Sequence, residues 1–367
     1  LPPDEEWVDV RYIPRSPKGA APRESRSTWC VFEQELGDRE HAVARAAGRG
    51  QWSLGMDSRG EVERQVRRFL FRGMSAAPAT RVFGRESDVL SRMPDVFPTS
   101  RNVVTKSGTF GYMRIATFNV ATDREFLDEF VRLVSGLSPR GLILDVRGNT
   151  GGLIHAGERL LQLLTPRPIE PARFHFLNSV RTLALTASHP FISQWRASIG
   201  QAVETGTDFS QGFSLLPAAQ YNDIGQKYQG PVVLVTDALC YSTTDIFAAG
   251  FQDHHIGTIL GVDANTGAGG ANVWEYALIA ELMADPAHFS ALPGDASFRF
   301  AVRRVTRVGE NAGVPLEDLG VLPDRLHRLT RRDVLERNVD LINRAARILA
   351  KRPSQRLTVR QRTAATF

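Results

Sequence analysis

Two short, almost uninterrupted apolar runs constrain the fold of this chain more than any other feature. They are "GLILDV" at 141–146 and "PVVLVTD" at 231–237. Neither run alternates with polar residues, which is typical of central strands in a parallel sheet that is covered on both faces. Small or turn-forming residues follow each run, and then come amphipathic helical patterns at 153–164 and 243–254. Strands that alternate with helices predict an α/β fold with a mostly parallel sheet.

Weaker patterns extend this core on both sides. Strands are predicted at 110–118, 256–261 and 298–309, and a helix is predicted at 122–137, where Thr122 and Glu125 have capping-box spacing. A last helix is expected to begin at Thr330 and to turn Val334, Leu341, Ala345 and Leu349 inward. These patterns predict an N-terminal accessory segment of unclear fold at 1–105, a core at 106–329 with an irregular insertion at 165–230, and a C-terminal helix with a basic tail at 330–367.

Composition limits the classes of partner. Of 367 residues, 42% are hydrophobic and 23% are charged, as in soluble globular proteins, and no apolar run reaches the roughly 18 residues of a membrane span. The net charge of +5 is concentrated in the tail, whose arginines lack interleaved aromatic residues, so nucleic acid is not an expected partner. The two cysteines, Cys30 and Cys240, have no zinc-site spacing and slightly favour a reducing, cytoplasmic compartment. The chain begins at Leu1 without a signal-like segment, so we expect a processed chain or a fragment. Its oligomeric state cannot be predicted.

The two turns that follow the apolar runs are candidate sites. After the second run, Ser242 precedes a helix and is spaced from Asp245 as in a capping box, which alone favours a structural cap. The same position could expose a nucleophilic hydroxyl beside the unpaired N–H groups of a helix N-terminus. After the first run, the glycine turn "RGNTGG" at 147–152 is either an ordinary tight turn or a cradle for an anion.

Taken together, these segments resemble the C-terminal-processing serine peptidases, a family that includes tail-specific protease and the tricorn core. The resemblance rests on "GYMRIATF", "GLILDVRGNTGGLI", "VVLVTDALCYSTTDIFAAGFQDH", "ILGVDANTGAGG" and "EDLGVLPD", and it covers roughly residues 108–326. It implies a crotonase-like α/β spiral with Ser242 as nucleophile. The N–H of Thr243 and a glycine N–H, Gly152 first and Gly151 next, would hold the oxyanion. It also implies a peptide or protein substrate bound as an added strand, without a metal or an organic cofactor.

The sequence departs from the family at the general base. Many members use a Lys in the loop that here reads "NTGAG", where Ala268 stands at the Lys position. The tricorn-like branch uses His and Glu instead, and Glu317, just before "GVLPD", fits that Glu. His41 would be the N-terminal His, while His155 and His327 are alternatives. Asp253 matches an Asp that some members need. Helix rise places Asp253 about 16 Å from Ser242, so a role supporting the loop at 264–270 is expected.

Three functions are compatible with this pattern. The first is an acyl hydrolase in which Ser242 works with a His and Glu317. The second is a non-catalytic peptide-binding relative, motivated by Ala268. The third, a crotonase-type enzyme acting on an acyl thioester, lacks a basic phosphate-binding cluster near the glycine turn. Cys240 is expected to fill space at a strand end rather than to act as a nucleophile.

Overall fold

The computed structural model describes residues 7–13, 21–28, 88–270, 273–283, 285, 288–296 and 298–352. The chain divides into two units, residues 1–42 and 43–367, each described here by itself. In the first unit, β1 (Trp7–Tyr12) pairs antiparallel with β2 (Arg23–Thr28). Arg26 forms an ion pair with Asp9 across this hairpin and lies over the ring of Trp7.

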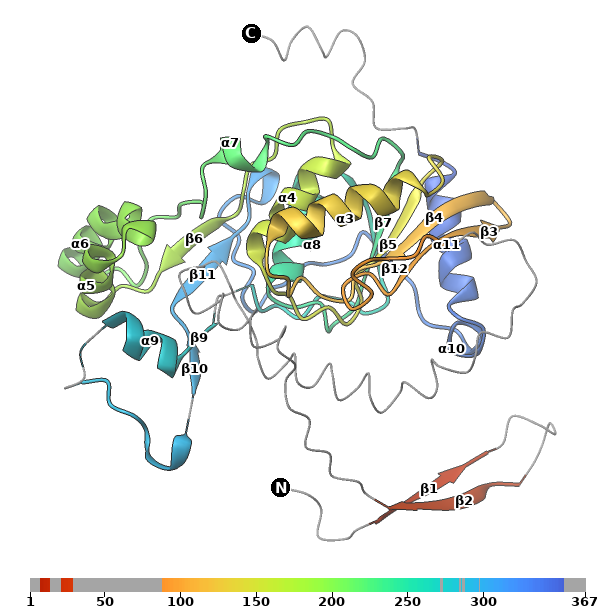
Figure 1. The fold of residues 1–367 in the computed structure, drawn as a ribbon, viewed down its shortest axis with the longest axis horizontal. Coiled ribbons are helices and arrows are strands. Elements are labelled where there is room, and N and C mark those ends of the chain that lie inside the picture. Colours follow the sequence, from red (N-terminus) through yellow and green to blue (C-terminus); the bar gives the residue numbers. More distant parts are fainter. Residues whose placement is uncertain are drawn as a thin grey trace, which may run out of the picture. The chain divides into compact units, whose positions relative to one another are not determined.

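The second unit is built on a six-stranded sheet in the order β12-β8-β7-β5-β4-β3 (Figure 1). Its strands are β3 (Thr99–Thr105), β4 (Gly108–Arg114), β5 (Leu142–Asp145), β7 (Val232–Thr236), β8 (Gly257–Gly261) and β12 (Arg325–Leu326). All neighbours are parallel except β3 and β4, which form an antiparallel pair at one edge. The predicted α/β fold with a mostly parallel sheet is therefore confirmed.

Helices cover both faces of this sheet, as the continuous apolar runs predict. Every residue of β5 and β7 is buried. On one face the large core includes side chains of α3 (Asp123–Ser135), α4 (Ile154–Leu164) and α8 (Thr243–Asp253). On the other face α11 (Val339–Leu349) packs through Leu341, Ala345 and Leu349 (Figure 1). Thr122 caps α3 by accepting the Glu125 N–H, and α4 ends at Leu164, just before Pro166.

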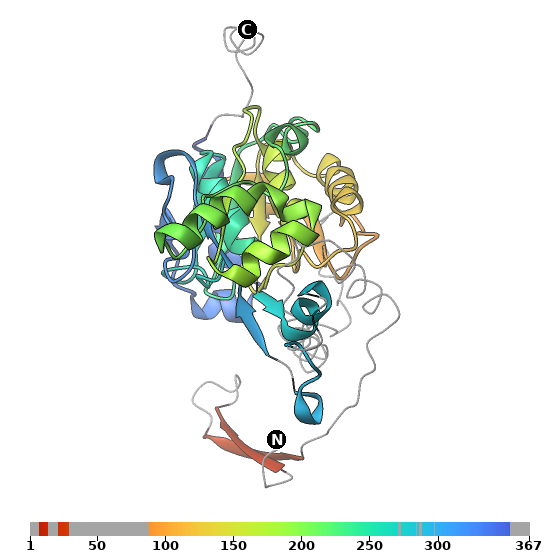
Figure 2. The same ribbon diagram turned by 90° about the vertical axis from the view of Figure 1, so that its left-hand side faces the viewer.

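Segments outside the sheet form a lateral extension of the second unit, at the left in Figure 1 and nearest the viewer in Figure 2. The insertion at 165–230 is more ordered than its sequence indicates. It holds β6 (Arg173–Phe176), α5 (Val180–Ser188), the 3-10 helix η1 (Pro190–Trp195), α6 (Arg196–Thr205) and α7 (Ala218–Tyr221). The β6 strand pairs with β11 (Arg303–Thr306). Farther along the chain come β9 (Val273–Glu275), α9 (Tyr276–Met283), the short 3-10 helix η2 (Pro293–Asp295), β10 (Arg299–Ala301) and η3 (Gly309–Asn311), and β9 pairs with β10.

The structure differs from the sequence predictions at three element boundaries. The edge strand β3 lies in the core sheet, although the sequence assigned its residues to the accessory segment 1–105. The strand predicted at 298–309 is divided between β10 and β11, which pair with different partners.

The predicted last helix is α10 (Arg331–Leu335) followed by α11, interrupted where Arg337 and Asn338 adopt positive φ. Val334, predicted to face inward, is 75% exposed because it lies on the short α10. Across the described residues, we find no helix of the length and apolarity that spanning a membrane requires.

Candidate functional site

The glycine turn after β5 and the serine turn after β7 lie side by side, because the two strands are parallel neighbours that end together. Three hydrogen bonds join the turns. The Gly148 N–H donates to Asp237 Oδ1 (2.9 Å), and the Tyr241 N–H donates to the Asn149 carbonyl (3.1 Å). The Thr243 hydroxyl donates to the Gly152 carbonyl (2.6 Å). The relative position of the two turns is thus fixed by directional bonds along their whole length.

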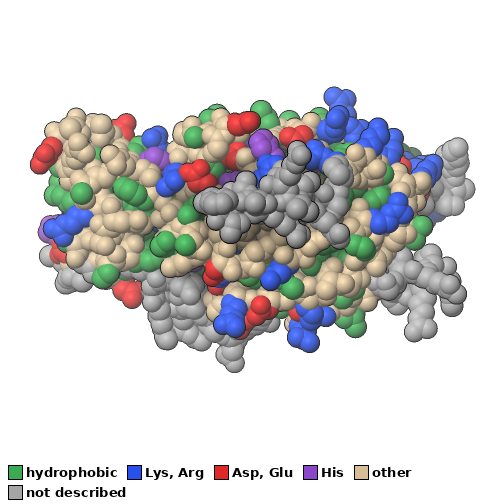
Figure 3. All heavy atoms as spheres, turned by 90° about the horizontal axis from the view of Figure 1, so that it is seen from above, with side chains coloured by type: hydrophobic (Ala, Val, Ile, Leu, Met, Phe, Trp, Pro, Cys, Tyr) green, Lys and Arg blue, Asp and Glu red, His purple; other side chains and the backbone are tan. Residues whose placement is uncertain are grey.

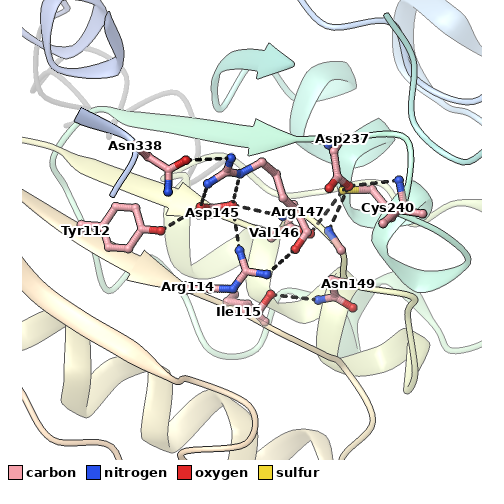
Figure 4. Close-up of polar contacts among 12 residues, drawn as sticks. Tyr112, Arg114, Ile115, Asp145, Val146, Arg147, Asn149, Asp237, Cys240 and Asn338 are labelled. Carbon is pink, nitrogen blue, oxygen red and sulfur yellow. Dashed lines mark hydrogen bonds and ion pairs between the residues drawn. The ribbon is translucent and has the colours of Figure 1, made fainter. Parts of the chain in front are cut away.

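A buried ionic network holds the end of β5 beneath the glycine turn (Figure 4). Asp145 is fully buried and accepts hydrogen bonds from the Tyr112 hydroxyl (2.7 Å) and from the Arg147 guanidinium (2.7 and 2.9 Å). Arg114 lies 3.4 Å from the same carboxylate and donates to the Arg147 carbonyl. Burial alone would raise the pKa of Asp145, but Arg147 and Arg114 outweigh it and lower that pKa to about 2. The network therefore stays ionised at neutral pH and keeps the turn rigid.

Ser242 adopts a backbone conformation that an ordinary helix cap does not use. Its φ is 55° and its ψ is −121°, and its side chain makes no capping hydrogen bond to α8. A serine cap instead takes extended φ and ψ and accepts an N–H from the first turn of the helix. The capping function predicted from the spacing to Asp245 is therefore not the function of the Ser242 side chain. Such a conformation costs of order 1–3 kcal/mol in a residue other than glycine, and strain of this kind clusters at functional sites.

The glycine turn approaches Ser242 more closely than any side chain there would allow. A Cβ on Gly151, at φ +103°, would lie 2.8 Å from the Ser242 Cβ and 2.9 Å from the Thr243 nitrogen. A Cβ on Gly152, at φ +139°, would overlap the backbone of Phe118 and Asn119 instead. The Gly151 N–H donates to Asn149 Oδ1 (3.0 Å), and the Gly151 carbonyl accepts the Phe118 N–H (2.8 Å). Because N–H and C=O point in opposite directions in a trans peptide, the Gly152 N–H is directed away from Phe118.

The start of α8 adds electrostatic character to this turn. Thr243 is the first residue of α8, so its N–H has no acceptor within the helix, and the helix dipole places partial positive charge there. Asp245 in the first turn is fully buried. Burial raises the pKa of Asp245 to about 6, although hydrogen bonds from Thr266 and Gly269 oppose the shift.

The glycine-rich loop at 264–270 lies directly on the serine turn. The Ser242 N–H donates to the Gly269 carbonyl (3.1 Å), and the Gly269 N–H donates to Asp245 Oδ2 (3.0 Å). A side chain on Gly269 would overlap the Tyr241 ring. Ala268, at the position where the family resemblance predicts Lys, has φ +58°, and its carbonyl accepts the Asp318 N–H (3.1 Å).

Glu317 lies beside this loop. Its Oε1 accepts the Val305 N–H (2.9 Å), while its Oε2 is buried without a hydrogen-bond partner. Burial raises the pKa of Glu317, and the nearby Asp245 carboxylate contributes in the same direction. The carboxylate is thus close enough to Asp245 to interact with it electrostatically and retains one oxygen that could accept a further donor.

The three candidate histidines are in different environments. His41 lies outside the described residues. His155, on α4, packs edge-on against Tyr221, and its Nε2 is buried without a hydrogen-bond partner. Burial lowers the pKa of His155 to about 4. His327 is buried, and its Nε2 lies 2.8 Å from Asp333 Oδ2 in α10. No hydrogen bond joins His155 or His327 to Ser242 or Glu317.

Asp253 and Cys240, for which the sequence also predicted roles, are each held by contacts of a structural kind. Asp253, expected to support the loop at 264–270, instead forms an ion pair with Arg307 and accepts a hydrogen bond from Asn311 Nδ2 (2.7 Å). It therefore anchors the segment after β11. Cys240 is fully buried and its thiol donates to the Val146 carbonyl (3.2 Å), while burial raises its pKa well above the usual range. A buried, protonated thiol of this kind fits the predicted filler role.

Sequence reasoning missed Asp237, Asn149 and Tyr241, which hold the two turns and the glycine loop together. Asp237 Oδ1 accepts the N–H groups of both Gly148 and Leu239. Its position immediately after β7 is a signal that could have indicated a turn-stabilising carboxylate. Within the described ranges, no three His, Cys, Asp or Glu side chains are grouped so as to hold a metal ion.

This chain is similar to one family of peptidases in sequence and to a set of solved structures in fold. The profile of peptidase family S41 matches residues 109–284, which include both turns, α8 and the glycine-rich loop. A search of curated proteins found no match. Among solved structures, mature CPAF complexed with lactacystin is similar at 14% identity with a TM-score of 0.58, over 94% of this chain and 68% of that one. The photosystem II D1 C-terminal processing protease is 21% identical with a TM-score of 0.39, over 70% of this chain and 52% of that one.

Proposed function

We propose, from the match of residues 109–284 to the profile of peptidase family S41, that this chain is a serine peptidase of that family with Ser242 as its nucleophile. The conformation of Ser242 carries the proposal. Ser242 is 3% exposed and has a φ of 55° between a buried strand and a helix, and a strained backbone of this kind supports a functional requirement at this residue. The proposal includes a crotonase-like spiral for the core and a peptide or protein substrate that adds as a strand.

Two backbone donors are proposed to hold the oxyanion. The Thr243 N–H has no acceptor within α8 and lies where the helix dipole favours negative charge. We assign the second donor to Gly152 rather than to Gly151, because the Gly151 N–H already donates to Asn149. The hydrogen bond from the Thr243 hydroxyl to the Gly152 carbonyl supports this pairing, because it connects the two residues whose N–H groups are the proposed donors.

The general base is proposed to be a histidine that Glu317 orients, as in the tricorn-like branch, and the candidates are His41, His155 and His327. Ala268 cannot accept a proton. His155, with a pKa of about 4, is a weak base at neutral pH, and His327 is bound to Asp333. The Ser242 Oγ then bonds to the carbonyl carbon while its proton passes to the imidazole. The C–N bond breaks as the imidazole returns the proton to the leaving amine. Water hydrolyses the acyl-enzyme by the same route in reverse.

A fluorophosphonate probe tests the nucleophile, because an activated serine hydroxyl displaces fluoride from phosphorus. We expect labelling of the wild type and none of Ser242→Ala. Ser210→Ala serves as the matched control, because Ser210 is also buried but lies in the insertion at 165–230. There its hydroxyl accepts the Phe176 N–H and donates to the Gln211 carbonyl. Equal labelling of wild type and Ser242→Ala would exclude Ser242 as the nucleophile.

The base is tested by His41→Gln, His155→Gln and His327→Gln in the same assay. One of the three should abolish labelling, and that variant identifies the base. Retained labelling in all three variants would refute a histidine base without affecting the assignment of Ser242.

Ala268 favours one alternative, a non-catalytic peptide-binding relative of the same fold. In that case the wild type would not label, and calorimetry would detect peptide binding that Ser242→Ala leaves unchanged. Peptide hydrolysis that depends on Ser242 would exclude this alternative.

A further inference from the structure

A pocket of about 370 Å³ lies on the opposite face of the sheet from α4 and α8, and it is lined largely by cations. Its described lining is Thr258, Arg325, Arg344, Arg347, Ile348, Lys351 and Arg352. The lining residues come from β8, from β12, from the C-terminal part of α11 and from the two residues Lys351 and Arg352 just after it. Five of these seven residues carry a positive charge, and none is acidic or aromatic. This is an unusual concentration of like charge in a concave site.

The geometry of two elements aims these side chains at one place. A spacing of three or four residues places four of the side chains on one side of α11 and of the turn that follows it: Arg344, Arg347, Ile348 and Lys351. Thr258 lies two residues before Leu260, whose side chain is in the core beneath α11, so both side chains point toward that helix. Arg325 comes from β12, which pairs with β8.

No ion pair joins any of the five side chains to another residue in the part of the chain that the structure describes. Residues 353–367 contain three more arginines and no Asp or Glu. Figure 3, which views the molecule from above, shows several Lys and Arg side chains gathered at the upper right, toward the end at which α11 lies in Figure 1.

We propose that this pocket binds a compact ligand that carries clustered phosphate groups. Arginine, which provides four of the five charges, presents a planar fork of donors that matches phosphate oxygens. An acidic peptide spreads its charges along about 3.3 Å of chain per residue, whereas a polyphosphate concentrates several charges in a volume of this size. Single-stranded nucleic acid is a poorer fit, because its bases need aromatic stacking surfaces.

The site is separate from the proposed peptidase site. Thr258 is near the amino end of β8, whereas Ser242 follows the carboxyl end of β7, and the two strands are parallel. The inference therefore does not depend on the chemistry of Ser242. The phosphate groups could belong to a soluble polyphosphate or to a lipid headgroup, and the experiment separates these sources.

Titration calorimetry of the intact chain with inorganic tripolyphosphate is the direct test. We expect binding at or below about 100 μM that the double variant Arg344→Gln/Arg347→Gln weakens at least tenfold. Arg167→Gln/Arg196→Gln removes the same charge from exposed arginines outside the pocket and should change the affinity less than twofold. Circular dichroism checks that both variants are folded. Equal weakening in the two variants, or none in the pocket variant, would overturn the proposal.

Vesicles containing a phosphatidylinositol bisphosphate form the second arm of the test. Binding to vesicles but not to tripolyphosphate, with the same dependence on Arg344 and Arg347, assigns the site to a lipid headgroup. Binding to neither probe up to about 1 mM overturns the proposal. Tighter binding of a single-stranded oligonucleotide than of tripolyphosphate, with that dependence, also overturns it in favour of nucleic acid.

Discussion

At the scale of single residues, the site depends on positions where no side chain can be tolerated and on one serine held in a strained conformation. Gly151 allows its turn to approach Ser242 and Thr243 within van der Waals contact. Ser242 itself has positive φ, as do Ala268 and Asp318 near the same loop. Strained residues persist only where the surroundings fix them, here through the bonds between the two turns and the glycine loop.

Gly151→Ala should inactivate the proposed site while leaving the fold intact. The new Cβ would lie 2.8–2.9 Å from the Ser242 Cβ, the Thr243 nitrogen and the Tyr241 carbonyl, so one of the turns must shift. We expect fluorophosphonate labelling to slow by about 100-fold or more, since displacement of the oxyanion donors has effects of that size. Gly206→Ala is the control, because Gly206 also has positive φ (+73°) but a Cβ there meets nothing within 4 Å. Similar labelling rates in the two variants would contradict the proposed geometry.

Glu158, on α4, should make stability depend on pH. It is 1% exposed, and burial raises its pKa from 4.5 to about 7. The folded state therefore holds the proton more tightly than the unfolded chain. Its contribution is most favourable at low pH and is lost as pH rises from about 4.5 to about 7, a change of order 3 kcal/mol.

Glu158→Gln removes this titration, so the free energy of unfolding of the variant should rise relative to wild type between pH 5 and pH 8. Urea unfolding of both proteins at pH 5 and at pH 8 measures this free energy. For the control Glu204→Gln, at an exposed position, the difference in free energy of unfolding from wild type should be the same at both pH values. A constant difference between Glu158→Gln and wild type across this range would show that Glu158 titrates normally.

At the scale of elements, the function of each turn depends on its neighbour. The glycine turn after β5 and the serine turn after β7 come from segments about 90 residues apart in the chain, and their bonds form only when the two strands pair. The Asp145 network supports one side of this arrangement, and the glycine-rich loop supports the other.

Thr243→Val and Thr244→Val form a matched test of this connection. Both threonines are fully buried neighbours in α8, but only the Thr243 hydroxyl has a partner, the Gly152 carbonyl. Thr243→Val should reduce the free energy of unfolding by about 1–3 kcal/mol, because the buried Gly152 carbonyl loses its hydrogen-bond donor. It should also slow labelling roughly tenfold, because the hydrogen bond that connects the residues of the two proposed oxyanion donors is lost. Thr244→Val should be neutral or slightly stabilising, and labelling should be unchanged. The opposite order of effects would rule out Thr243 as the residue that positions the glycine turn.

The elements that the sequence predicts well are those whose burial is uniform. The central strands β5 and β7 are buried on both faces, so their apolar runs indicate both position and environment. The edge strand β3 has mixed burial and polar residues, and its sequence therefore resembles a loop. The break between α10 and α11 also escaped prediction, because it is made by Arg337 and Asn338 at positive φ rather than by Gly or Pro.

The site was predictable only in part for a related reason. Ser242 and the glycine turn lie in local motifs, each within a few residues of a strand end. The connections through Asp237 and Asn149, and the surroundings of His155 and His327, arise from tertiary packing that spacing does not encode. The expected supporting role of Asp253 was misplaced because its partners, Arg307 and Asn311, are more than 50 residues away in the chain.

At the scale of the whole second unit, the sheet separates two cores of unequal size. The larger core lies under α3, α4 and α8, and the smaller one consists of residues that pack under α11. The proposed peptidase site belongs to the carboxyl ends of the strands, whereas the cationic pocket lies under the end of α11. Thus α11 covers one face of the sheet and, together with Lys351 and Arg352 just after it, supplies five of the seven residues that line the pocket.

Leu349→Ala tests how far the sheet depends on α11. Leu349 is 1% exposed and packs against Gly141 and Phe110, next to the start of β5. Truncation of a buried leucine costs about 2–5 kcal/mol, which combines lost burial with the cavity left behind. Because the core under α11 is small, we expect little repacking and a cost in the upper half of that range, measured by urea unfolding. Val334→Ala, on the exposed α10 position, should change stability by less than about 0.5 kcal/mol. If both variants unfold at the same urea concentration, α11 contributes no more to the sheet than a surface helix does. If Leu349→Ala is destabilised yet still labels at Ser242 when folded, the helix stabilises the unit without shaping the catalytic turns on the other side.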